Sequence, residues 1–301
     1  MEISAGMVRD LREKTGAGMM KCKEALIACK GNADEAVDYL RKKGLASAEG
    51  KSGRATSEGI ILGRIAENGQ EAVLMEVNCE TDFVAKNDQF RNLTNSVLQV
   101  AIKNSQIKTP EQLMQEKLDG QIIDEVRKVM VAKIGENITF SRFDRLAIPA
   151  GNHGVFDAYL HGEEQKVGVL VQLECTNADG AKTPELKTFC HEIALQVCAM
   201  KPRFISRKDV PEEFHRHEKD IILGQLKEDP KNCNKPEEIL HKIIEGRLDK
   251  YFKECCLVEQ ISIKDDTQTI QKMIDDLSTK LGGQVKVAAF RRWMVGEAPV
   301  A

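Results

Sequence analysis

The hydrophobic pattern of residues 5–44 predicts three short helices. Apolar residues recur there every three or four positions, which is the spacing of one face of a helix. The clearest series lies in the second helix and consists of Met19, Cys22, Leu26 and Cys29. Because short turns join the three helices, the sequence predicts a small helical bundle, followed by a linker of small and polar residues at 46–58.

The ends of these helices carry start and stop signals. Gly16 can end the first helix, and Gly31 can take the left-handed conformation that is common after a helix. Asn32 with Glu35 three residues later is a capping-box arrangement, so it marks the start of the third helix. We expect that helix to end at Gly44.

Two later stretches share one pattern of apolar and polar positions. "GIILGRIAENGQEAVLMEVNCETD" begins at Gly59, and "GVFDAYLHGEEQKVGVLVQLECTN" begins at Gly154. Each predicts a strand, a tight polar turn and a second strand, and an amphipathic segment near 88–103 or near 184–200 then predicts a helix. Because "VLMEVNC" and "VLVQLEC" align without a gap, we interpret the two stretches as a duplication, although unrelated antiparallel hairpins can also look alike.

Residues 202–256 differ from the rest, because they hold two long charged segments with apolar residues at helical spacing. The expected apolar faces consist of Phe214, Ile221, Leu226, Ile239, Ile243, Leu248 and Phe252. The short connection "PKNCNKP" predicts that the two helices form an antiparallel hairpin. A last apolar segment at 284–295 is expected to rejoin a sheet as a strand.

These elements predict the α+β class, with two related subdomains that each contain an antiparallel sheet and a helix. The expected parts are a three-helix module at 1–45, a linker at 46–58, a core subdomain at 59–150, a second core subdomain at 151–201 and 257–295, a helical hairpin inserted at 202–256 and a tail at 296–301.

The charge of the chain argues against a general binder of polyanions. The 301 residues hold 44 Lys and Arg against 47 Asp and Glu, which gives a net charge of −3 and a pI near 6.1. Residues 1–54 hold 11 basic and 8 acidic residues, whereas nucleic-acid-binding domains usually carry a strongly basic stripe. We therefore expect no nucleic acid as a partner. A helix-turn-helix at 5–44, with Lys42 and Lys43 on phosphates, is the weaker alternative.

The sequence shows no motif of a targeting signal or a membrane helix. The nine cysteines form no C-x-x-C pair, and the N-terminal residues have no apolar core typical of a signal peptide. No apolar run approaches the roughly 20 residues that a membrane helix needs. We therefore expect a cytoplasmic protein with reduced thiols and no membrane contact.

No motif of an enzyme stands out. The chain has no G-x-x-x-x-G-K-[ST] loop, and His215 with His217 lack further metal ligands, so we expect neither cofactor nor metal. Cys190 beside His191 resembles a nucleophile with its base, but neighbouring side chains on a helix diverge. A buried thiol is the preferred interpretation, and an enzyme that uses this pair is the weakest hypothesis.

One aromatic residue is unexpected where it stands. Phe83 lies in "CETDFVAKND", a turn from strand to helix, whereas the matching segment of the second copy, "TNADGAKTPE", has no aromatic residue. The fold therefore does not demand Phe83. One interpretation is a core residue or a staple on the following helix, although Val84 and Phe90 could already serve that purpose. The other is an exposed anchor that enters a pocket of a partner. His161, at the end of a predicted strand, is either a hydrogen-bonded edge residue or a contact residue.

Several motifs together resemble the bacterial elongation factor Ts family, in the same order and over residues 3–297. They are "LREKTGAGMMKCKEAL", "EVNCETDFVAKND", "VAKIGENI", "YLHG" before "VGVLV", "KPRFISRKDVP" and "EGRLDKYFKE". The resemblance implies a guanine-nucleotide exchange factor for elongation factor Tu, a GTPase of translation. It also implies an N-terminal module of ubiquitin-associated type that docks on the GTPase domain, and a core that is monomeric or that forms a homodimer in a two-to-two complex.

The resemblance also assigns roles to residues. Asp82 and Phe83 match the T-D-F-V motif, whose phenylalanine inserts between helices of the GTPase, disturbs its magnesium and phosphate site and releases GDP. His161 matches a histidine at the partner interface. The full set of partner-binding residues that this implies is Met19, Met20, Thr81, Asp82, Phe83, Val84 and His161.

Three positions depart from the family pattern. Lys21 stands where the family usually has Asp, Gln165-Lys166 replaces a usual Gly-Arg, and Ile261-Ser262 stands where Pro-Phe is common. None of the three lies in the T-D-F-V motif, so they bear on contacts elsewhere.

Overall fold

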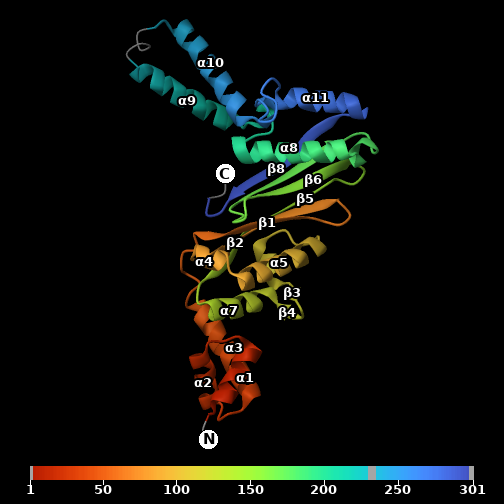
Figure 1. Ribbon diagram of the computed structural model, residues 1–301. Helices are drawn as coiled ribbons and strands as arrows, with labels where there is room; N and C mark the ends of the chain where they lie inside the picture. Colours follow the sequence, from red (N-terminus) through yellow and green to blue (C-terminus); the bar gives the residue numbers. More distant parts are fainter. Residues whose placement is uncertain (1–2, 230–234, 298–301) are drawn as a thin grey trace.

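The computed structural model describes residues 3–229 and 235–297, and it confirms a mixed α+β protein. Three helices stand at one end, two three-stranded antiparallel sheets form the middle, and two long helices project at the other end (Figure 1). Within the described residues, no helix is both long and apolar enough to cross a membrane.

The N-terminal bundle has the three helices that the sequence predicts. They are α1 (Ala5–Thr15), α2 (Met19–Ala28) and α3 (Ala33–Glu49). Gly16 ends α1 with a φ of 67°, and Gly31 after α2 has a φ of 85°. The side chain of Asn32 accepts hydrogen bonds from the backbone N–H groups of Asp34 and Glu35, which confirms it as the N-cap of α3.

The prediction that α3 ends at Gly44 is wrong. The helix continues to Glu49, because the segment "LASAE" consists largely of good helix formers. Gly44 instead marks a close contact with α7 (Ile123–Ile134), where a Cβ atom on this glycine would lie 3.1 Å from the Cβ of Ala132. The first residues of the predicted linker are therefore helical and pack beside the core.

The first core subdomain is a sheet with helices on one face. Its strands, in the order β1-β2-β5, are β1 (Glu58–Ile65), β2 (Glu71–Cys79) and β5 (Ile138–Ala147). The shorter elements and the helices are α4 (Asp82–Ala85), α5 (Asp88–Lys103), α6 (Pro110–Gln115), β3 (Lys117–Leu118), β4 (Gln121–Ile122) and α7. Fully buried Met75 of β2 and Phe90 of α5 belong to the core between sheet and helices.

The second core subdomain repeats this plan. Its strands, in the order β6-β7-β8, are β6 (His153–His161), β7 (Val167–Cys175) and β8 (Val285–Met294). Its helices are the short η1 (Gly180–Lys182), α8 (Pro184–Met200), η2 (Arg207–Asp209), η3 (Leu257–Glu259) and α11 (Ile270–Leu281). The predicted last strand thus joins a sheet, where it pairs with β7.

The two sheets pack face to face. Ile61 of β1, Leu74 of β2, Phe156 of β6 and Leu170 of β7 are buried in one cluster between them. The order of layers is therefore helices, sheet, sheet, helices (Figure 1). Because β2 and β7 are covered on both faces, every residue of each strand after the first is buried, including the polar side chains of Glu76, Asn78, Gln172 and Glu174.

The two subdomains share irregularities of the backbone at matching positions. β2 shifts its register against β5 between Glu76 and Val77, and β7 shifts against β8 between Gln172 and Leu173. A Cβ atom on Gly59 would lie 2.2 Å from the carbonyl oxygen of Val77. A Cβ atom on Gly154 would lie 2.2 Å from the carbonyl oxygen of Leu173. The same irregularities at matching positions support the duplication.

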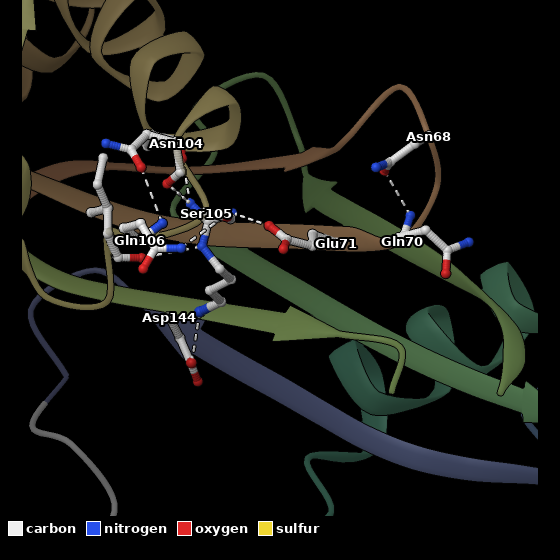
Figure 2. Close-up of polar contacts among 10 residues, drawn as sticks. Asn68, Gln70, Glu71, Asn104, Ser105, Gln106 and Asp144 are labelled. Atoms are coloured by element: carbon white, nitrogen blue, oxygen red, sulfur yellow. Dashed lines mark hydrogen bonds and ion pairs between the residues drawn. The ribbon is translucent and has the colours of Figure 1, made fainter. Parts of the chain in front are cut away.

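A buried arginine fastens the first sheet to the end of α5. The side chain of Arg145 on β5 is 1% exposed, and its guanidinium group lies 2.5 Å from the carboxylate of Glu71. It also donates to the backbone carbonyls of Asn104, at 3.0 Å, and Ile107, at 3.1 Å (Figure 2). This set of bonds satisfies a buried charge and fixes the chain that leaves α5.

The predicted helical hairpin consists of α9 (Glu212–Glu228) and α10 (Glu237–Cys255), and part of its connection lies outside the described residues. The predicted apolar faces are confirmed in part, because Leu226, Leu248 and Phe252 are buried as expected. Ile222 and Ile244 are also buried, whereas the predicted Ile221 is 40% and Ile239 is 46% exposed. Spacing alone did not decide between neighbouring isoleucines such as Ile221 and Ile222.

Candidate partner-binding site

The turn after β2 sends neighbouring side chains in opposite directions. Phe83, in the single-turn helix α4, is 80% exposed, the largest exposed fraction among the exposed large hydrophobic side chains. Val84 and Ala85, the next two residues, are 7% and 4% exposed and belong to the core of the first subdomain. The turn is therefore anchored by two buried side chains while it presents a phenyl ring to solvent.

Thr81 ties this turn to the loop between α7 and β5, to which the sequence analysis assigned no role. Its backbone N–H donates to the carboxylate of Glu136 at 3.0 Å, and its hydroxyl donates to the same carboxylate at 2.7 Å. The thiol of Cys79 donates to the carbonyl of Thr81 at 3.1 Å. Burial, followed by the nearby carboxylates of Glu136 and Glu58, raises the pKa of Cys79 to about 12, so this thiol stays protonated at neutral pH.

Ion pairs join the turn to the second subdomain. Lys86 lies 3.3 Å from the carboxylate of Asp82 and 3.0 Å from that of Glu164, which belongs to the turn between β6 and β7. Glu164, followed by Asp82, raises the pKa of Lys86, and Lys86 in turn lowers the pKa of Glu164. Exposed pairs of this kind stabilise weakly, but they link the turn that carries Phe83 to the turn of the second hairpin.

The departure at Gln165-Lys166 is accommodated in the same turn. Gln165 adopts a φ of 53°, and its carbonyl accepts a hydrogen bond from the backbone of Ile61 at 2.8 Å. The ammonium group of Lys166 lies 2.7 Å from the carboxylate of Glu58. Both residues therefore connect the second hairpin to β1.

His161 is exposed at the end of β6, an edge strand, and it is also hydrogen-bonded. Its Nδ1 atom lies 2.9 Å from the hydroxyl of Tyr159. The ring of Tyr159 packs in turn against His191, with 5.7 Å between centroids. The structure confirms the hydrogen-bonded edge histidine, and a contact of His161 with a partner stays a prediction.

Met19 and Met20 lie at the start of α2 and are 58% and 70% exposed. The sequence placed Met19 on the inward face of this helix, and that was wrong. The buried residues of α2 are Cys22, Ala25 and Leu26. Ile27 is also exposed, at 57%. The N-terminal bundle therefore carries exposed apolar side chains that its own core does not use.

The other two departures have structural roles. Lys21 donates to the backbone carbonyl of Ala132 at 3.0 Å, so it fastens α2 to the end of α7. Ile261 is 49% exposed, whereas Ser262 is 5% exposed and its hydroxyl accepts hydrogen bonds from the backbone N–H groups of Lys264 and Asp265.

The residues that resembled catalytic groups are separated. Cys190 is fully buried, burial raises the pKa of its thiol, and the nearest acceptors of that thiol are backbone carbonyls. His191 turns instead to Asp157, at 3.2 Å. His215 stacks on Phe252. Over residues 3–229 and 235–297, no group of three or more His, Cys, Asp and Glu residues is arranged to hold a metal ion.

Comparisons with known proteins agree on one family. The family model described as Elongation factor TS matches residues 80–297. A curated relative named Elongation factor Ts, from Symbiobacterium thermophilum, is 41% identical over 296 residues, which cover 98% of this chain and 93% of the relative. Relatives of the same name from Clostridium novyi and Clostridium perfringens are 40% and 38% identical, with the same coverage.

Proposed function

The chain belongs to the elongation factor Ts family, and from this membership we propose that Asp82 and Phe83 form the wedge that releases GDP from elongation factor Tu. Members of this family are nucleotide exchange factors for elongation factor Tu in translation elongation, and they make or break no bonds. The finer step concerns how this chain performs the exchange.

The observation that carries the proposal is the exposure of Phe83 on an anchored turn. An exposed phenyl ring gains about 1.5–3 kcal/mol when a partner buries it. Because Val84 and Ala85 hold the turn in the core, little flexibility is lost when the ring enters a pocket. Thr81 and Val84 therefore support the wedge from behind, and Asp82 beside the ring can compete for cationic groups or backbone donors of the partner.

Release of GDP follows from linkage rather than from chemistry. A factor that binds the nucleotide-free GTPase more tightly than the GDP-bound form must weaken GDP binding by the same factor. The wedge fits only the open form of the nucleotide site, so it shifts the population towards that form. GTP then binds to the open site and displaces the factor.

Two further surfaces are proposed as contacts. Exposed Met19 and Met20 give the N-terminal bundle an apolar patch that suits docking on the GTPase domain. His161 lies on the second hairpin, whose turn pairs with Lys86, and is proposed to contact a second site on the partner. A cytoplasmic location, the absence of nucleic-acid binding and a homodimer through the core stay predictions, and light scattering of the complex tests the last of these.

The test is stopped-flow release of a fluorescent GDP from elongation factor Tu. Phe83→Ala should lower the maximal rate of release more than about tenfold, as expected for loss of an aromatic anchor. Ile65→Ala is the matched control, because Ile65 is 37% exposed at the opposite end of the same hairpin. Full activity of Phe83→Ala would contradict the proposed role of Phe83 as the wedge. If the intact protein does not accelerate release, the exchange function itself is contradicted.

A further inference from the structure

The loop between α7 and β5 holds the proposed wedge turn from outside. Glu136 accepts both hydrogen bonds from Thr81, and the backbone N–H of Asn137 donates to the carboxylate of Glu80 at 2.6 Å. Residues 80 and 81 are thus fastened side by side to residues 136 and 137. Phe83 follows only two positions later.

The same loop also holds the chain that arrives from the N-terminal bundle. The side chain of Asn137 is 1% exposed and donates to the backbone carbonyls of Ser52, at 3.2 Å, and Arg54, at 3.1 Å. Arg54 in turn lies 3.5 Å from Glu80. Two segments that are distant in sequence therefore meet at one loop.

α7 leads directly into this loop and also carries the N-terminal bundle. Gly135 ends the helix with a φ of 94°, which turns the chain towards Thr81. Arg41 of α3 pairs with Glu125 of α7 at 2.5 Å. The bundle and the wedge turn are thus attached to the same helix, one along its side and one at its end.

The wedge turn depends on this outside support. α4 has only four residues and no side chain caps its N-terminus, where the Thr81 hydroxyl donates to Glu136. A carboxylate that accepts two hydrogen bonds forms a stronger and better oriented contact than a neutral acceptor. Other polar contacts hold the far end of this turn, where Arg91 donates to the carbonyl of Ala85 at 3.1 Å and Lys86 pairs with Asp82 and Glu164. The carboxylate of Glu136 holds the other end, at Thr81, directly before α4.

We propose that Glu136 is a positioning residue for nucleotide exchange, which acts through Thr81 to hold the turn that carries Phe83. This inference rests on the proposed role of Phe83. Glu136 itself does not touch the nucleotide. Without its carboxylate, the protein still folds and docks, but the phenyl ring enters the partner less often in the productive orientation.

The experiment measures GDP release against factor concentration for Glu136→Gln, with Glu67→Gln as the control. Glu67 is exposed in the turn between β1 and β2, so it undergoes the same chemical change away from the loop. Glu136→Gln keeps the shape of the side chain but cannot accept both bonds with a charged group. We expect its maximal rate to fall about fivefold, with a less than twofold change in the half-saturating concentration. The control should match the intact protein.

Variants of Thr81 separate positioning from misfolding. Thr81→Ser keeps both donors and should keep the rate, whereas Thr81→Val loses the hydroxyl and should lower it. Combined with Glu136→Gln, Thr81→Val should add less than its separate effect, because the two changes remove the same bond. Thermal unfolding curves of all variants report whether the fold is intact.

The outcomes distinguish this inference from the proposed function. A full maximal rate for Glu136→Gln, or a strictly additive double variant, overturns the positioning role while Phe83→Ala can still be defective. A defect in Glu136→Gln beside a fully active Phe83→Ala also overturns it, because the effect then does not pass through the wedge. Failure of the intact protein to release GDP overturns both.

Discussion

Neighbouring residues in one short turn have opposite tasks. Val84 packs in the core, whereas Phe83, one position earlier, faces solvent and is proposed to serve recognition. The sequence left two interpretations of Phe83, a core residue or an exposed anchor, and its exposure in the structure excludes the first. Glu136 was not predictable, since its partner Thr81 lies 55 positions away and no local pattern signals that contact.

This division gives a prediction at the scale of single residues. Val84→Ala removes buried methyl groups and should lower the free energy of unfolding by about 1–3 kcal/mol. Phe83→Ala should change it by less than about 0.5 kcal/mol, because the ring is 80% exposed. Urea unfolding measures both values. A large loss of stability in Phe83→Ala would show that the ring packs against the protein in solution.

At the scale of elements, the local sequence pattern indicates where helices and strands lie, whereas contacts between elements decide where some of them end and which side chains they bury. Helix and strand positions in both repeats were predictable, since turn residues and periodicity bound them on each side. The end of α3 and the buried isoleucines of α9 and α10 were not, because contacts with other elements decide them. α7 covers Gly44, and Ile222 and Ile244 are buried between the two hairpin helices. Local sequence carries no record of those contacts.

The close approach of the sheets yields a second prediction. A Cβ atom on Gly168 of β7 would lie 2.3 Å from the Cγ2 atom of Ile61, so Gly168→Ala should destabilise the protein by about 1–3 kcal/mol. Gly246→Ala is the control, because Gly246 lies on the exposed side of α10 with nothing near its missing Cβ. That change should stabilise by about 0.5–1 kcal/mol. Equal effects on the denaturation midpoint would contradict face-to-face packing of the sheets.

The whole molecule is extended, with the N-terminal bundle and the helical hairpin at opposite ends of the four-layer core (Figure 1). The bundle is small and is attached mainly along α7, through the Gly44 contact, the Arg41–Glu125 pair and Lys21. The Arg41–Glu125 pair and the Lys21 bond are exposed and stabilise weakly, whereas the end of α3 is held more firmly, because Ala48 is buried in the core of the first subdomain.

Loosening this attachment is the third prediction. Gly44→Leu forces a side chain against Ala132 and should separate the bundle from α7. Small-angle scattering should then report a larger maximal dimension, while the main thermal transition of the core stays unchanged. Gly6→Leu, on the exposed side of α1, should leave both quantities as they are. An unchanged scattering profile for Gly44→Leu would mean that the bundle is held by other contacts.

The strand β8 has a consequence for how the protein is made. It follows all other described helices and strands in the chain, yet it completes the second sheet and reaches the first subdomain, where Arg142 donates to the carbonyl of Met294 at 2.7 Å and the backbone of Gly296 donates to Glu76 at 3.0 Å. The N-terminal end of a chain emerges first from the ribosome, so the bundle and the first sheet can form early. The second sheet must wait for β8. A prematurely ended chain therefore exposes the unpaired edge of β7, and such an edge marks an unfinished product for chaperones and proteases.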